Sequence, residues 1–404
     1  MKLPSAGGPH LTYCTNIHAG ETWPEVQANL ARYVVAVKER VARDRPFGVG
    51  LRLSALAAEA LADPGQLERF RDFLRAHDLY VFTINGFPYG PFHGVRVKEE
   101  VYLPDWLDPA RLAYTDRLAR LLADLLPAEP GLEGSVSTVP GAFKARVRDE
   151  ADAARMGDMI VEHAATLHGI RERTGKSISL ALEPEPFCHM ETVAETVSFF
   201  EQHVFSTVAV KRLGALTGLD GAAGEAFLRH HVGVCFDACH MAVEFEEPEA
   251  ALRALRAAGI RIAKVQISAG LRVHLGGRDD ATLAELRPFA EGVYLHQVVE
   301  RRDGALTRFL DLPEALEAAA RSGTAAAEWR IHFHVPLFKE RLGAFLNTQD
   351  FLRRLLAVLR VEPVSPHLEV ETYTWDVLPE EHRREDIVTA VARELDWVLD
   401  HLVR

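Results

Sequence analysis

The stretch Ser179-Leu180-Ala181-Leu182-Glu183-Pro184-Glu185-Pro186 decides how the rest of the chain is interpreted. It begins as a short apolar strand, in which Leu180 and Leu182 share one face because side chains alternate along a strand. Pro184 has no N–H and cannot extend a central ladder, so we expect the strand to end at Glu183. The sequence therefore predicts a carboxylate at the carboxyl end of a buried strand, where α/β barrels hold their active sites.

Three further apolar segments end in polar side chains of the same kind. They close with Asp237-Ala238-Cys239-His240, with Gln266, and with Glu369-Val370-Glu371. Glu369 and Glu371 lie on the same face of their strand, and Glu371, nearer the strand end, is the one expected to reach the rim. A carboxylate at a strand end can instead cap the following helix, so each of these acids also has a purely structural interpretation.

Length and composition indicate a soluble globular protein. The 404 residues suffice for one large barrel with insertions or for two domains. Hydrophobic residues make up 48% and charged residues 26%, while the net charge of −12, without any basic run, argues against nucleic acid as the main partner. We find no apolar run of the roughly 18 residues that a membrane span needs and no signal-peptide pattern at the start. Four sparse cysteines fit a reducing compartment, so a cytoplasmic location is expected.

Strand-like and helix-like stretches alternate along the chain, as is typical of βα units around a parallel sheet. We expect eight principal strands, at residues 11–17, 47–53, 80–84, 134–139, 179–183, 232–237, 260–268 and 367–373. An Asp303-Gly304 turn predicts a hairpin in an insertion at about 271–328, between the last two strands. The predicted fold is a single-domain (β/α)₈ TIM barrel over residues 1–404. A doubly wound open sheet is the alternative, weakened because no glycine-rich phosphate motif follows the first strand.

The segment Trp329-Arg330-Ile331-His332-Phe333-His334 supplies two histidines at positions i and i+2. If the segment is extended, Arg330, His332 and His334 share one face and the histidines can bind one metal ion or two adjacent ions. Carboxylate and imidazole donors favour a divalent cation, most readily Zn or Mn. Gln266 is a poor ligand and has substrate binding as its alternative role. The predicted metal ligands are Glu183, Asp237, His240, Gln266, His332, His334 and Glu371.

At these residues the chain resembles the xylose isomerase-like TIM barrels, which include sugar isomerases, ketose epimerases and endonuclease IV-type phosphodiesterases. That resemblance implies metal ligands on the fifth, sixth and eighth strands, and Glu183, the pair Asp237 and His240, and Glu371 stand in that order. The family's histidine on the seventh strand falls at Gln266, a departure that affects the metal site. His332 and His334 resemble the extra ligand pair of the phosphodiesterase branch.

Across nearly its whole length the chain is also similar to the EboE family of metabolite traffic proteins. The segments that carry this resemblance are Asn85-Gly86-Phe87-Pro88-Tyr89-Gly90, His332-Phe333-His334-Val335-Pro336-Leu337 and His367-Leu368-Glu369-Val370-Glu371-Thr372-Tyr373-Thr374-Trp375. The resemblance implies a role in the production or export of secondary metabolites, with a small-molecule metabolite and other proteins of an export pathway as partners. It implies no particular reaction.

Three functions are open on the sequence alone. The first is a metal-dependent isomerase or epimerase of a small polyhydroxylated, cyclitol-like metabolite, in which Glu183 and Glu371 remove and return a proton. In that reading Lys264 or Arg330 holds a phosphate or carboxylate of the substrate, and His93 and Asn85 complete the substrate-binding set. The second is a non-catalytic metabolite-binding component of a traffic pathway. The third is a metal-dependent phosphoesterase that uses the histidine pair to build a second metal site.

Overall fold

Eight parallel strands form a barrel in the computed structural model, which describes residues 1–276, 280–322, 326–383 and 385–403. Their order in the sheet is β1-β14-β7-β6-β5-β4-β3-β2. The strands are β1 (His10–Tyr13), β2 (Phe47–Arg52), β3 (Leu79–Asn85), β4 (Gly134–Thr138), β5 (Ile178–Leu182), β6 (Val232–Asp237), β7 (Ile262–Ile267) and β14 (His367–Val370). The predicted (β/α)₈ barrel is confirmed.

The ring closes between β1 and β2. Cys14 forms an isolated parallel bridge with Gly50, and the hydroxyl of Thr12 donates to the carbonyl of Gly48 at 2.7 Å. Position 50 requires glycine, because a Cβ atom there would overlap the carboxylate of Glu369. The chain leaves β1 early, at Tyr13, and continues as a 3₁₀ turn, so the predicted strand 11–17 is shorter than expected.

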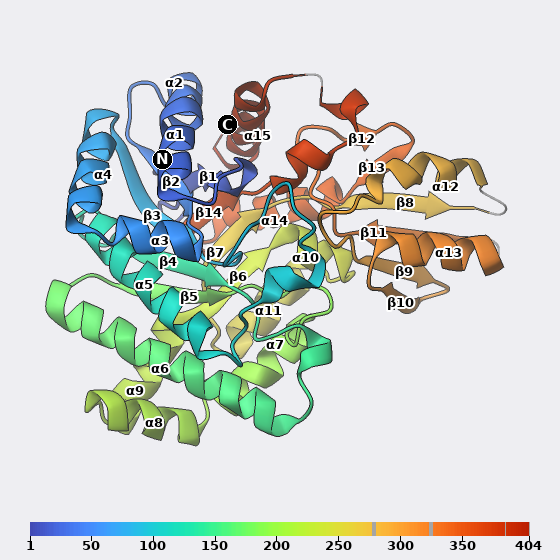
Figure 1. Ribbon diagram of the computed structural model, residues 1–404. Helices are drawn as coiled ribbons and strands as arrows, with labels where there is room; N and C mark the ends of the chain where they lie inside the picture. The colour runs from blue at the N-terminus through green and yellow to red at the C-terminus, as the bar shows by residue number, and fades with distance from the viewer. Residues whose placement is uncertain (277–279, 323–325, 384, 404) are drawn as a thin grey trace.

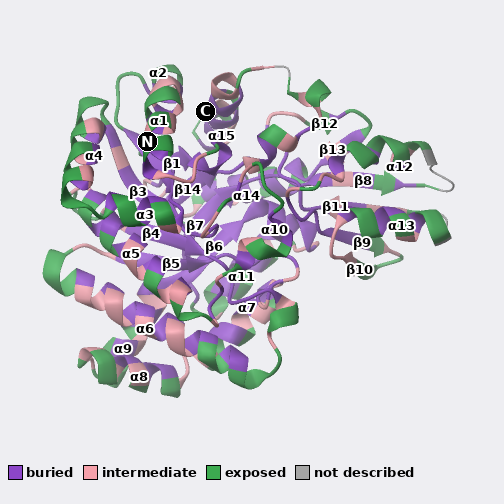
Figure 2. Ribbon diagram, in the orientation of Figure 1, coloured by how far each residue is buried: buried purple, intermediate pink, exposed green. Residues whose placement is uncertain are grey.

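Helices surround the barrel and turn their exposed faces outward (Figures 1 and 2). Several begin with a side chain that caps the first turn, among them Asp63, Asp108 and Asp149. The helices of this layer are α1 (Trp23–Asn29), α2 (Val35–Val41), α3 (Ala55–Leu61), α4 (Pro64–Ala76), α5 (Pro109–Leu125), α6 (Glu150–Thr174), α7 (Val193–Phe199), α8 (Thr207–Thr217), α9 (Gly221–His231), α10 (Ala238–Val243), α11 (Pro248–Ala257), α14 (Gln349–Val361) and α15 (Ile387–Leu402).

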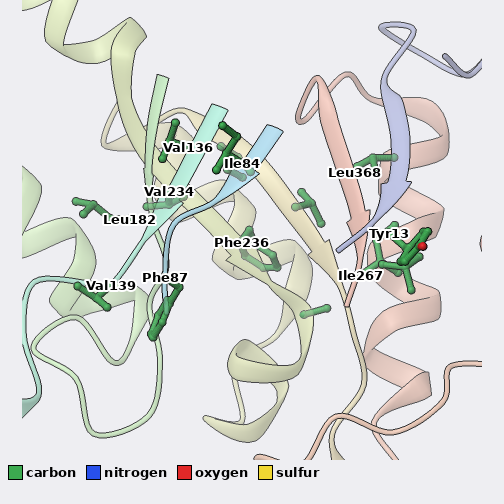
Figure 3. Packing of buried hydrophobic residues seen from close by; sticks show 14 of the residues in the cluster. Tyr13, Ile84, Phe87, Val136, Val139, Leu182, Val234, Phe236, Ile267 and Leu368 are labelled. Carbon is green, nitrogen blue, oxygen red and sulfur yellow. The ribbon is translucent and has the colours of Figure 1, made fainter. Parts of the chain in front are cut away.

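The core lies between the strands and this helical layer. Every residue of β5 and β6 is buried, as expected for parallel strands that are covered on both faces. Figure 3 shows apolar side chains of neighbouring strands in this core, among them Leu182, Val234 and Phe236. The barrel thus gives a rigid frame whose strand ends present polar side chains at one rim.

A second, antiparallel sheet lies between β7 and β14 in the sequence, in the order β10-β9-β11-β8-β13-β12. Figure 1 shows it beside the barrel, with α12 and α13 against it. It extends to Asn347, beyond the insertion boundary near 328 that the sequence suggested. Its elements are β8 (Leu271–Leu275), α12 (Asp280–Leu286), β9 (Val298–Arg302), β10 (Ala305–Phe309), α13 (Leu312–Ser322), β11 (Ala327–Ile331), β12 (Arg341–Leu342) and β13 (Phe345–Asn347).

Two local features of this sheet matter for the site. Strands β9 and β10 form a hairpin around Asp303 and Gly304, both at positive φ, as a tight two-residue turn requires. Strand β11 ends at Ile331, so the expected extended segment 329–335 stops short of the histidine pair. His332 and His334 therefore lie in a loop.

None of the described helices is long and apolar enough to cross a membrane.

Candidate metal centre

Three carboxylates from three barrel strands meet at one rim. Glu183 follows β5, Asp237 ends β6 and Glu371 follows β14, and one oxygen of each lies within 4.8 Å of the other two. All three side chains are buried. Their convergence follows from the parallel strands, whose carboxyl ends all open on the same side of the barrel.

Asp237 serves both as a helix cap and as part of this group. Its Oδ1 accepts hydrogen bonds from the backbone N–H of His240 at 3.0 Å and from the hydroxyl of Ser268 at 2.7 Å. Its Oδ2 is buried and has no hydrogen-bond partner among the described residues. The structural role at the start of α10 thus uses one oxygen and leaves the other for a ligand.

Glu183 and Glu371 differ in how they are held. Glu371 Oε1 accepts hydrogen bonds from the amides of Asn16 at 2.8 Å and Asn85 at 3.2 Å. Glu183 Oε2, by contrast, is buried without a hydrogen-bond partner in the part of the chain that the structure describes. A buried charged oxygen without a partner is costly, so this atom requires a proton, a cation or a ligand.

Three histidines add imidazole nitrogens, and their partners assign the tautomers. Nδ1 of His240 lies 2.9 Å from the carbonyl of Pro184, and Nδ1 of His334 lies 3.0 Å from the carbonyl of Glu371. Nδ1 of His332 lies 2.7 Å from Oε1 of Gln297. Because a carbonyl oxygen can only accept, each Nδ1 carries the hydrogen and each Nε2 keeps its lone pair. Metal-ligating histidines show this arrangement.

The lone pairs of two of these histidines face each other. Nε2 of His240 and Nε2 of His332 are 3.1 Å apart. With both Nδ1 atoms protonated, two such lone pairs repel unless a proton or a cation lies between them. The close approach is therefore a second observation, besides the unpartnered carboxylate oxygens, that fits a bound metal ion.

The donors form overlapping groups of three, each within 4.8 Å. Asp237, His240 and His334 form one group next to the three carboxylates, and Glu185, His240 and His332 form another. Cys239 joins the two loop histidines in a fourth group. We call Glu183, Glu185, Asp237, His240, His332, His334 and Glu371 the carboxylate–imidazole cluster. Such oxygen and nitrogen donors suit zinc or manganese, so the residues fit the predicted divalent cation.

Burial and mutual repulsion shift the pKa values in the cluster. Burial, then the neighbouring acids, raises the pKa of Glu183 and of Glu371 well above the usual range. Burial acts to raise the pKa of Asp237 too, but His240 and His334 outweigh it and lower that pKa. Burial lowers the pKa of His334 to about 4, which keeps its imidazole neutral at pH 7. A neutral imidazole and an ionised Asp237 are the protonation states that metal binding requires, whereas an ion that binds here must displace the protons of Glu183 and Glu371.

A cavity with about 510 Å³ of empty space, part of it open to solvent, lies over the cluster. Phe92, Tyr294 and Tyr373 roof it, with ring centroids 5.0 to 5.3 Å apart. Phe92 and Tyr294 lie in two separate loops, and Tyr373 begins a 3₁₀ turn, Tyr373–Val377. The cavity therefore combines a polar floor with an aromatic roof, as small-molecule sites commonly do.

The structure places two predicted substrate-binding residues near this cavity. Asn85 lines it and donates to Glu371. His93 is half-buried beside Phe92, and it is not among the residues that line the cavity. The loop 85–94 thus contributes the amide of Asn85 and the ring of Phe92 to the site.

The structure places the other predicted residues away from the cavity. Lys264 lies inside the barrel, where its Nζ is 2.5 Å from Oε2 of Glu369. Gln266 pairs across the sheet with Glu369, one level below Glu371, and its Oε1 accepts from the thiol of Cys235. Arg330 turns toward the second sheet and donates to Glu328 at 2.8 Å and to the carbonyl of Ala242 at 2.7 Å. None of the three lines the cavity.

Sequence reasoning missed four residues that the fold brings to the site. Glu185 belongs to one ligand group and accepts a hydrogen bond from the hydroxyl of Tyr102 at 2.8 Å. Gln297 donates to the same hydroxyl at 2.9 Å and orients His332, and Asn16 holds Glu371. The second acid of the Glu-Pro-Glu-Pro motif was a usable signal for Glu185. The place of Asn16 near the end of the predicted strand 11–17 was a signal of the same kind, whereas Tyr102 and Gln297 had none.

The fold and the site together define a TIM barrel with a buried cluster of potential metal ligands at its carboxyl rim. No family model and no curated protein matches the chain. Among solved structures it is similar to a xylose isomerase-like TIM barrel protein from Mycobacterium smegmatis in complex with magnesium, at 15% identity over 99% of this chain and 98% of that chain, with a TM-score of 0.49.

Two further solved structures are also similar to the chain. One is the IOLI protein with a binding zinc atom, at 12% identity over 97% of this chain and 98% of that chain, with a TM-score of 0.43. The other is a D-tagatose 3-epimerase-like protein, at 12% identity over 70% of this chain and 88% of that chain, with a TM-score of 0.37.

Proposed function

We propose that the protein is a metal-dependent isomerase or epimerase of a small polyhydroxylated metabolite. One observation carries the proposal. Three buried carboxylates and an imidazole converge next to the cavity, which Glu183 and Glu371 line, and Glu183 Oε2, Asp237 Oδ2 and His334 Nε2 lack partners among the described residues. Glu183, Asp237, His334 and Glu371 would hold the ion, which supplies Lewis-acid stabilisation of negative charge on substrate oxygens.

The chain's own residues divide the proton transfer between them. Glu183, with a free oxygen at the floor, takes the proton from the carbon next to the substrate carbonyl, and the electron pair moves onto the carbonyl oxygen. Glu371, oriented by Asn16 and Asn85, returns a proton to the neighbouring carbon or to the opposite face. The aromatic rings cover part of the cavity and limit the access of bulk water to this exchange.

The charge of the cavity favours an uncharged substrate. Lys98 is the basic side chain among the described residues that line it, and its Nζ already binds Asp311 Oδ2 and the carbonyl of Tyr294, each at 2.6 Å. Because Arg330 and Lys264 lie elsewhere, a phosphate on the substrate finds no side-chain counter-charge here. We therefore assign neutral polyols or ketoses, cyclitols among them, as the substrate class.

The test is solvent hydrogen exchange. The zinc- or manganese-loaded protein is incubated in D₂O with a panel of ketohexoses and inososes, and deuterium at the carbon next to the carbonyl is followed by NMR. Glu183→Gln should abolish exchange and keep the circular dichroism spectrum. Glu133→Gln, at the opposite end of the barrel, is the matched control and should exchange normally. Equal exchange by Glu183→Gln and the wild type would remove Glu183 from this role.

A second candidate is a metal-dependent phosphoesterase. The group Glu185, His240 and His332 lies directly beside the three carboxylates and shares no residue with them, which favours two ions side by side. Two adjacent ions can activate water and stabilise the leaving oxygen. Elemental analysis of the protein as purified decides between the candidates, because two or three ions per chain support the phosphoesterase and one ion supports the isomerase.

The resemblance to the EboE family supports a setting in the production or export of secondary metabolites, in the cytoplasm and next to other proteins of the pathway. In that setting the protein could also be a non-catalytic metabolite carrier. Neutralisation of the strand-end acids by Arg330 and Lys264 would favour the carrier. Arg330 instead pairs with Glu328, and Lys264 pairs with Glu369, the strand-end acid below the cavity, so neither forms an ion pair with the acids of the carboxylate–imidazole cluster. The unneutralised cluster supports a bound cation and hence the enzyme.

A further inference from the structure

A glutamate on the last helix is buried among apolar residues. Glu394 lies in α15 and is 2% exposed. Its Oε1 accepts two hydrogen bonds, from the backbone N–H of Leu337 at 3.1 Å and from the hydroxyl of Thr372 at 2.8 Å. A buried carboxylate is costly even with such bonds. The position packs against the barrel, where a leucine would serve a purely structural purpose better.

The two donors belong to the loops that carry metal-centre residues. Leu337 follows His334 by three positions in the loop after β11, and Thr372 follows Glu371 directly after β14. The same loops are joined twice more. His334 Nδ1 donates to the carbonyl of Glu371 at 3.0 Å, and the hydroxyl of Thr374 donates to the carbonyl of His334. Glu394 therefore completes a set of bonds that fixes one loop against the other.

We propose that Glu394 is a positioning residue of the candidate metal centre, which holds the loops of His334 and Glu371 at the separation at which their donor atoms reach one ion. The inference rests on the metal-binding part of the proposed function and not on the isomerase chemistry. Glu394 touches neither ion nor substrate. It acts through Leu337 and Thr372 on the two ligands beside them.

The structure distinguishes two substitutions at this position. Glu394→Met keeps the volume but leaves the N–H of Leu337 and the hydroxyl of Thr372 buried without an acceptor. Glu394→Gln keeps a carbonyl oxygen in the place of Oε1. Burial raises the pKa of Glu394 to about 7, so a neutral amide resembles a state that the native side chain already populates near neutral pH.

The experiment measures zinc affinity by competition with a chromophoric chelator and the visible absorption of the cobalt-loaded protein. For Glu394→Met we expect zinc binding about 10- to 100-fold weaker and an altered cobalt spectrum, the usual consequence of losing a group that orients a ligand. Glu394→Gln should stay within about threefold of the wild type. Thr372→Val removes one of the two bonds and should fall between the two.

The matched control is Asp116→Leu. Asp116 is another partly buried acid that joins two segments, accepting from His163 at 2.7 Å and Thr166 at 2.8 Å in the layer of α5 and α6. Its loss should lower the melting temperature and leave zinc affinity and the cobalt spectrum unchanged. A purely structural Glu394 would behave in the same way.

The outcomes separate this inference from the proposed reaction. If Glu394→Met binds zinc with wild-type affinity and keeps the cobalt spectrum unchanged, the positioning role is wrong. If Glu394→Met does not fold, the same result in Thr372→Val overturns the positioning role. A wild-type protein that binds zinc but exchanges no proton refutes the isomerase and leaves the positioning role intact. A wild-type protein that binds neither zinc nor cobalt overturns both.

Discussion

Lys264 and Glu369 form an ion pair inside the barrel, with Nζ and Oε2 2.5 Å apart and both side chains 0% exposed. Replacing Lys264 with methionine keeps most of the volume and leaves Glu369 as a buried charge without a cation. Breaking a buried pair from one side costs about 3–5 kcal/mol, because the remaining charge cannot be hydrated. Against a total stability of about 5–15 kcal/mol, which is typical of folded proteins, such a loss is large enough to measure.

The double variant Lys264→Met/Glu369→Met is the matched control. It removes both charges, so we expect its free energy of unfolding to lie within about 1 kcal/mol of the wild type, since buried pairs are often replaced by apolar residues at no cost. Urea unfolding followed by circular dichroism gives both values. A single variant that loses less than about 1 kcal/mol, or a double variant as unstable as the single one, would show that the uncompensated charge of Glu369 does not destabilise the barrel. Zinc affinity should survive in the double variant, because the pair lies below the cavity.

Three further predictions concern pH, metal and ligand orientation. Burial lowers the pKa of His231 to about 4, against 6.5 in the unfolded chain, so the unfolded state binds more protons between these pH values and stability falls as the pH drops. This residue should account for about 2 kcal/mol between pH 7 and pH 5, measured as the difference between the wild type and His231→Gln in urea unfolding at both pH values. Zinc at 100 times its dissociation constant should stabilise the protein by about 2.7 kcal/mol, and a chelator should reverse the rise in melting temperature. Asn16→Ala removes the 2.8 Å bond to Glu371 and should weaken zinc binding about tenfold in a chelator competition, more than Asn85→Ala, whose bond is 3.2 Å long.

The barrel could be predicted because its determinants are local. Alternating apolar strands, a proline directly after Glu183 and capping residues before the helices each limit the backbone within a few residues. The end of β11 could not be predicted in this way. The chain turns at Ile331 because the N–H of His332 donates to the carbonyl of Gln297 and the N–H of Phe333 returns to Ile331. The first of these bonds links residues 35 positions apart, so the pattern of apolar residues within the segment cannot predict it.

Glu183, Asp237 and Glu371 could be predicted from their positions at the carboxyl ends of apolar strands, because the ends of parallel strands lie at the same rim of a barrel. This reasoning did not separate them from Lys264 and Gln266. The alternation of side chains along a strand predicts which residues face the inside of the barrel, but it does not predict how far each lies from the rim. Gln266 faces inward, but its partner across the sheet is Glu369, so it stops one level below the rim. The imidazole beside Asp237 comes instead from His334, in a loop that the sequence treats as strand.

The protonation of the three histidines is the feature of the site that depends most on the complete fold. Each Nδ1 meets a carbonyl oxygen from a different segment, namely the loop after β5, the loop before β9 and the end of β14. One segment alone could accept the hydrogen bond from its histidine without fixing where the Nε2 atom of that ring lies relative to the other two. Together the three segments leave all three Nε2 atoms without a hydrogen, although His240 and His332 then repel each other at 3.1 Å. Burial makes both that repulsion and the unpartnered acids costly, and one shared cation would relieve both, whereas protons would have to be supplied to each group separately.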